Sequence, residues 1–140
     1  MIMELSEFIS RNLGKKVDYD NAFGAQCVDL ARQVWKDVYG IPERLEPCST
    51  TGGAKDLYVD YDKMPKEKKY LTKISKNRTF LQGDTLVWDS NPNNKYGHVA
   101  IFICKLDDKL CVLEQNGFSQ KGCEVTIRTK DNLLGGLRKK

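Results

Sequence analysis

The chain has 140 residues, of which 40% are hydrophobic and 30% charged, and its net charge of +4 is typical of one globular domain over residues 1–140. No apolar run approaches the roughly 20 residues that cross a bilayer, so we expect no membrane insertion. Basic and aromatic residues are not interleaved as they are in nucleic-acid platforms, so we expect no nucleic-acid partner.

The first two apolar stretches have helical spacing. They comprise Leu5, Phe8, Ile9 and Leu13, followed by Gly14, and then Val28, Ala31, Val34, Trp35 and Val38. We therefore expect a second helix that begins close to Cys27, after a loop over residues 15–24. Further along, residues 54–61 indicate a short helix and residues 64–69 a charged connection.

After residue 84 the pattern changes to short β-branched or apolar runs that turn residues separate. These runs cover residues 85–88, 99–104, 110–113 and 125–128. Because the expected helices precede the expected strands, we predict an α+β fold in which N-terminal helices pack on an antiparallel β-sheet.

The five cysteines cannot all pair, and the start of the chain lacks the basic and apolar regions of a secretory signal, so we expect reduced thiols. One histidine excludes a zinc site that needs two, and the cysteine spacings do not match the usual zinc pairs. Cys104 and Cys111 are expected to face each other across a hairpin as small apolar core residues.

Cys27 and His98 are the candidates for nucleophilic chemistry. The N–H groups at a helix start favour the thiolate form of Cys27. His98 is the one imidazole in the chain, and an imidazole exchanges protons near neutral pH. Glu114 and Asn116 end the next expected strand and would reach His98 if the two strands are neighbours. Each residue also has a purely structural interpretation. Cys27 would be a packed core residue, His98 a surface or hydrogen-bonded residue, and Glu114 and Asn116 the polar end of a strand.

Four blocks resemble the CHAP family of cysteine- and histidine-dependent amidohydrolases and peptidases. Residues 18–30 resemble its nucleophile motif, and residues 83–88 (Gly-Asp-Thr-Leu-Val-Trp) resemble its G-D-hydrophobic-hydrophobic-W strand. Residues 97–101 (Gly-His-Val-Ala-Ile) and 113–116 (Leu-Glu-Gln-Asn) resemble its histidine strand and its E-x-N ending. The blocks stand in the family's order.

The resemblance implies a papain-like α+β fold and a role for each candidate residue. Cys27 would be the nucleophile, His98 the base, Glu114 the orienting carboxylate and Asn116 an accessory polar group. Gln26 would lie beside the oxyanion site, where the Cys27 backbone N–H is the expected donor.

A calcium loop is a second expectation. In the twelve-residue window 18–29, carboxylates stand at the EF-hand positions 1, 3 and 12, which are Asp18, Asp20 and Asp29. The backbone carbonyls of Ala22 and Gly24 would serve at positions 5 and 7. The window departs from an EF-hand at position 6, a phenylalanine, and at position 12, an aspartate. Some CHAP members that resemble this chain bind Ca²⁺ through the same loop. The alternative is an Asp/Asn turn that caps the helix.

The resemblance implies a peptidoglycan hydrolase, either an endopeptidase or an N-acetylmuramoyl-L-alanine amidase, as in phage lysins. We expect a monomer that stays in the host cytosol before release to the cell wall, or that travels on a virion. Two alternatives remain open: an amidase for a small cytosolic substrate such as a glutathione conjugate, and a non-catalytic binding or inhibitor module on the same fold.

Overall fold

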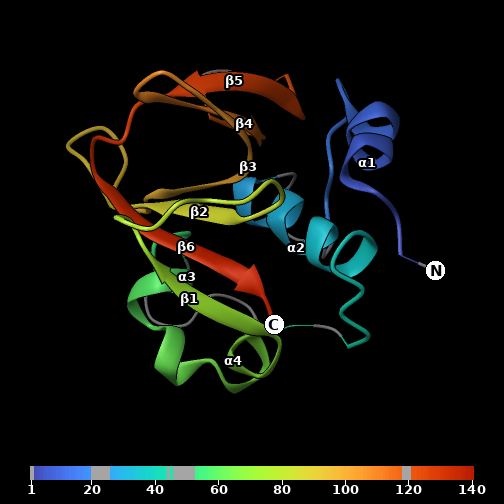
Figure 1. Ribbon diagram of the computed structural model, residues 1–140, viewed down its shortest axis with the longest axis horizontal. Helices are drawn as coiled ribbons and strands as arrows, with labels where there is room; N and C mark the ends of the chain where they lie inside the picture. The colour runs from blue at the N-terminus through green and yellow to red at the C-terminus, as the bar shows by residue number, and fades with distance from the viewer. Residues whose placement is uncertain (1, 20–25, 44, 46–52, 118–120) are drawn as a thin grey trace.

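The computed structural model describes residues 2–19, 26–43, 45, 53–117 and 121–140. Its helical elements are α1 (Leu5–Asn12), α2 (Cys27–Asp37), α3 (Asp56–Val59), the 3-10 turn η1 (Tyr61–Lys63) and α4 (Pro65–Tyr70). Its strands are β1 (Leu71–Ser75), β2 (Thr85–Trp88), β3 (His98–Leu106), β4 (Lys109–Glu114), β5 (Glu124–Arg128) and β6 (Leu133–Lys139). The six strands form one antiparallel sheet in the order β1-β6-β2-β3-β4-β5, with α2 against β3, so the predicted α+β fold is confirmed (Figure 1).

The two N-terminal helices begin and end where the sequence predicts. In α1 the buried residues Leu5 and Phe8 form an apolar stripe, and the chain turns away at Gly14, whose φ of +82° is left-handed. The first turn of α2 is capped by Asp29, whose carboxylate accepts the Gln26 N–H at 2.9 Å. This hydrogen bond satisfies a donor at the helix end and makes Gln26 the N-cap. Helix α2 therefore starts at the next residue, Cys27.

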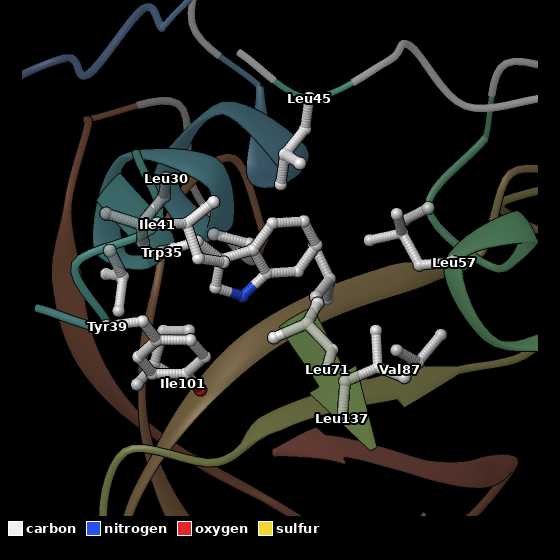
Figure 2. Close-up of a cluster of buried hydrophobic side chains, with 14 of the residues drawn as sticks. Leu30, Trp35, Tyr39, Ile41, Leu45, Leu57, Leu71, Val87, Ile101 and Leu137 are labelled. Carbon is white, nitrogen blue, oxygen red and sulfur yellow. The ribbon is translucent and has the colours of Figure 1, made fainter. Parts of the chain in front are cut away.

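Both faces of the sheet are apolar, because side chains alternate along each strand. One face packs against the helices and includes Val87, Val99, Ile101, Leu113 and Leu137. The other carries Leu86, Trp88, Ala100, Phe102, Leu110 and Val112. Figure 2 shows the Trp35 indole of α2 in the middle of the first cluster, and its Nε1–H donates to Thr85 Oγ1 at 2.8 Å. This buried bond links the helix layer to β2.

Two expectations were wrong in part, and two strands had not been predicted. Residues 64–69 are not a plain connection, since Pro65–Tyr70 forms α4 with Pro65 at its first turn. Strands β1 and β6 lie outside every run that the sequence analysis identified. Cys104 does pair with Cys111 across the β3–β4 hairpin, but only Cys111 is buried, while Cys104 is exposed.

Within the described ranges, none of the helices has the length and apolar character needed to cross a bilayer.

The Trp35 hydrogen bond can be tested by replacing Trp35 with Phe. We expect the free energy of unfolding to fall by about 2 kcal/mol, because the change leaves a small cavity and removes one of the two buried hydrogen bonds of the Thr85 hydroxyl, which keeps Tyr39 as a partner. Urea denaturation measures the loss, with Val59→Ala at an exposed position as the control. Equal midpoints for parent and Trp35→Phe would contradict this account.

Candidate active site

Cys27 is the first residue of α2 and is half-buried at the edge of an open cleft. The cleft has a volume of about 450 Å³, and Gln26, Cys27, His98 and Asn116 are among the residues that line it. Cys27 therefore lies at the N-terminus of α2, the end at which a helix dipole attracts negative charge. The sulfur is therefore accessible from the cleft.

His98 is the first residue of β3, and its ring lies between two partners. Its Nε2 is 3.0 Å from Glu114 Oε1, and the Cys27 side chain is also hydrogen-bonded to the ring. Because Nε2 contacts Glu114, Nδ1 is the nitrogen that is left for Cys27. The structure thus brings the predicted cysteine, histidine and glutamate into one contiguous chain of hydrogen bonds.

Backbone geometry holds His98 at this place. His98 pairs with Trp88 across β2 and β3, and the two rings lie with their centroids 6.1 Å apart. The preceding residue, Gly97, has a φ of +76°, and a β-carbon there would collide with the Trp88 carbonyl oxygen. Only glycine fits this turn without strain, so it brings the chain tightly into β3 just before the imidazole.

Glu114 is fully buried at the end of β4, and Arg128 of β5 keeps it charged. The Arg128 guanidinium donates from Nε to Oε1 and from a terminal nitrogen to Oε2, the latter at 3.2 Å. Burial by itself raises the pKa of Glu114, but the hydrogen bonds from His98 and Arg128 outweigh it and lower the pKa to about 2. Glu114 therefore accepts a hydrogen bond from His98 as a carboxylate throughout the neutral range.

The pKa of His98 is raised above its ordinary value. Burial is the largest influence and lowers the pKa, but hydrogen bonds to Cys27 and to Glu114 together exceed it. A histidine with a raised pKa holds its proton closer to neutral pH. It can therefore stabilise a neighbouring thiolate and then give that proton to a leaving group.

Asn116 and Gln26 also reach the cleft. Asn116 lies two residues beyond Glu114, outside the strand, with a left-handed φ of +59°. This turn directs the chain past His98, and Asn116 lines the cleft with Cys27. Gln26 is exposed beside Cys27, on the rim where the oxyanion site is predicted. The roles assigned to these two residues stay predictions.

A second hollow of about 670 Å³ adjoins the first. Asn94, Gly97, His98 and Asn116 line both, while Trp88 and Arg128 line only the second. The His98 ring therefore lies at the boundary between two open spaces. A substrate could extend from Cys27 past the imidazole into the second space, which suits the cleavage of a bond within a longer molecule.

Two residues of the site escaped the sequence analysis. Arg128 stood at the end of an expected strand, and no local pattern links it to Glu114, 14 residues earlier. Gln115 was read as the variable position of the E-x-N ending, yet its side chain is buried and hydrogen-bonded to Val17 and Gln26. Both contacts depend on long-range packing.

The calcium prediction falls mainly outside the described residues, which exclude Asp20, Ala22 and Gly24. Among those that are described, no group of three or more histidine, cysteine or acidic side chains is placed to hold a metal ion. Asp18 Oδ1 is buried and has no hydrogen-bond partner among the described residues, which fits a role as a cation ligand. One carboxylate oxygen of Asp29 accepts the Gln26 N–H, which fits the alternative that these acidic residues cap the helix.

The charge state of Glu114 predicts a pH-dependent stability. Folding lowers its pKa from 4.5 to about 2, so its contribution is present above pH 4.5 and is lost as the pH falls toward 2. We expect Glu114→Gln to reduce the free energy of unfolding by about 3 kcal/mol at pH 7 and by progressively less below pH 4.5. Urea denaturation at several pH values measures this. The control is Glu7→Gln, at an exposed site, and a difference that stays constant down to pH 2 would contradict the account.

The fold is similar to two solved structures. The wild-type endolysin LysIME-EF1 matches with a TM-score of 0.65 at 20% identity, over 99% of this chain and 64% of that chain. Ly7917 matches with a TM-score of 0.57 at 19% identity, over 81% of this chain and 53% of that one. This chain thus spans less than two-thirds of either. The CHAP domain family matches residues 16–116, more than half of the chain and the part that holds Cys27, His98, Glu114 and Asn116. The protein therefore belongs to the CHAP domain family.

Proposed function

We propose that this chain is a peptidoglycan hydrolase that cleaves amide bonds through Cys27 and His98. One observation carries the proposal: the Cys27 side chain is hydrogen-bonded to the His98 ring in an open cleft, while Glu114 holds the opposite side of that ring. Membership of the CHAP family and the fold shared with an endolysin support the choice of a cell-wall substrate.

In the proposed reaction the Cys27 sulfur attacks the carbonyl carbon of the amide. The C–N bond then breaks as the His98 imidazolium gives its proton to the leaving nitrogen, and an acyl thioester forms. A water molecule, deprotonated by His98, attacks the thioester, releases the carboxylic acid and restores the thiol. The transient oxyanion would be bound by the Cys27 backbone N–H, with Gln26 beside it.

The remaining residues would act by orientation. The Glu114 carboxylate holds Nε2, so that Nδ1 stays aimed at Cys27, and Asn116 bounds the cleft that receives the substrate. We also propose that the chain is a phage lysin, synthesised in the host cytosol and active on the wall after release. Endopeptidase and N-acetylmuramoyl-L-alanine amidase activities would produce different new chain ends, which mass spectrometry separates.

Replacing Cys27 by Ala tests the mechanism. We expect the rate of wall lysis to fall at least about 1,000-fold, because no other group replaces the nucleophile. Loss of turbidity of purified cell walls measures the rate, and mass spectrometry of the soluble fragments identifies the bond.

The matched control is Cys104→Ala, which removes an exposed thiol on β3 away from the cleft and should leave lysis unchanged. Equal lysis by Cys27→Ala would refute the mechanism. Walls that release no new peptide ends would favour an amidase for a small substrate, and failure of iodoacetamide to label Cys27 selectively would favour a non-catalytic module.

We also propose a structural Ca²⁺ site before α2, held by Asp18, Asp20 and Asp29 with the carbonyls of Ala22 and Gly24. The buried and unpartnered Asp18 Oδ1 supports it. A bound ion would neutralise these carboxylates and fix the chain that leads to Cys27. It would supply no catalytic chemistry.

Chelation tests the calcium site. We expect EDTA to lower the melting temperature by roughly 5–10 °C and to lower activity in parallel, and added Ca²⁺ to restore both. Asp18→Asn should remove most of the response, whereas Glu7→Gln should keep it. A melting temperature that EDTA leaves unchanged would reject the site.

A further inference from the structure

Glu114, the last residue of β4, and Gln115, the residue after it, point their side chains to opposite faces of the sheet. Glu114 shares the face of Val112 and reaches His98, whereas Gln115 shares the face of Leu113 and turns toward the helix layer. Gln115 is only 1% exposed, although glutamine is usually found at the surface. A buried amide of this kind is retained only where its hydrogen bonds are satisfied.

The Gln115 amide is fully hydrogen-bonded, and all of its partners are backbone groups. Its Oε1 accepts the Val17 N–H at 2.7 Å, and its Nε2 donates to the Val17 carbonyl at 2.7 Å and to the Gln26 carbonyl at 2.9 Å. One side chain therefore holds two points of the chain that lie on either side of residues 18–25. The second point is the residue immediately before Cys27.

We propose that Gln115 is a positioning residue that sets the start of α2, and with it Cys27, in register with His98. The inference rests on the proposed function of the Cys27–His98 pair. Glu114 orients the imidazole from one face of β4, and Gln115 places the sulfur from the other. Because both residues belong to one short stretch of backbone, the distance between nucleophile and base is set by a single element.

Only a primary amide satisfies this site. The three backbone partners require one acceptor and two donors on the same planar group. A glutamate at position 115 would accept from Val17 N–H but, as a carboxylate, would confront two carbonyl oxygens without a hydrogen atom between them. A methionine would fill the volume but would remove the hydrogen bonds to the Val17 N–H and carbonyl, and the Gln26 carbonyl would keep only the helical N–H groups of Asp29 and Leu30.

The experiment measures the alkylation of Cys27 by iodoacetamide as a function of pH in the parent, Gln115→Met and Gln115→Glu. Trypsin releases residues 17–32 as a peptide in which Cys27 is the one cysteine, so mass spectrometry follows this thiol separately from the others. No cell-wall substrate is needed. In the parent, Cys27 should be alkylated faster than the exposed Cys104, because the His98 ring lies beside the Cys27 sulfur.

We expect Gln115→Met to slow alkylation of Cys27 by roughly 10- to 100-fold, because the sulfur is no longer held beside the His98 ring. Gln115→Glu should behave in the same way at neutral pH. Its rate relative to the parent should recover in acid, where the protonated carboxyl regains one donor. This recovery keeps the test decisive even if Gln115→Met fails to fold.

Tyr61→Phe is the matched control, because it also removes a buried side-chain donor to a backbone carbonyl, that of Leu71 at 2.6 Å, away from the cleft. It should lower the melting temperature as Gln115→Met does, yet leave the Cys27 profile unchanged. If both Gln115 variants keep the parental profile, Gln115 has only a structural role and the inference is overturned. If the parental Cys27 itself reacts as an ordinary thiol, the proposed function fails as well.

Discussion

The buried carboxylate of Glu114 is the group on which the arrangement of the site depends. A charge taken out of water is tolerated only if hydrogen bonds replace its hydration, and here Arg128 supplies two donors and His98 a third contact. Arg128 in turn lies over the Trp88 ring, 5.6 Å from its centroid. The imidazole therefore faces Cys27 because an ion pair and an aromatic ring behind it leave few other orientations.

The antiparallel sheet brings the residues of the site together from distant segments of the chain. Strands β3, β4 and β5 are neighbours, so residues 98, 114 and 128 meet although they lie far apart in the sequence. The side-chain alternation of β4 continues to the residue after the strand: Glu114 turns to the imidazole and Gln115 to the chain before α2. A shift of one residue in the β3–β4 register would exchange these faces and dismantle the site.

The elements that the sequence predicted correctly have strong local periodicity, and those it missed do not. Strand β6 contains Gly135 and Gly136, and glycine is depleted in strands. In the sheet a β-carbon on Gly135 would meet the Tyr58 ring, and one on Gly136 would lie 2.9 Å from the Thr85 carbonyl oxygen. Close packing thus requires the two glycines, and the same glycines kept β6 from being predicted from the sequence. Helix α4 escaped for a related reason, since its charged residues show no apolar stripe.

The sequence by itself determined the candidate chemistry. One histidine, a cysteine at a predicted helix start and a glutamate at a predicted strand end restrict the choice, because residue type and short-range periodicity are local properties. Only the tertiary structure decided which residues support them. Gln115 bonds to Val17 across 98 positions, and Arg128 to Glu114 across a strand pair. Such contacts follow from sheet register and side-chain direction. Both arise only when separate segments pack together, so no local sequence pattern predicts them.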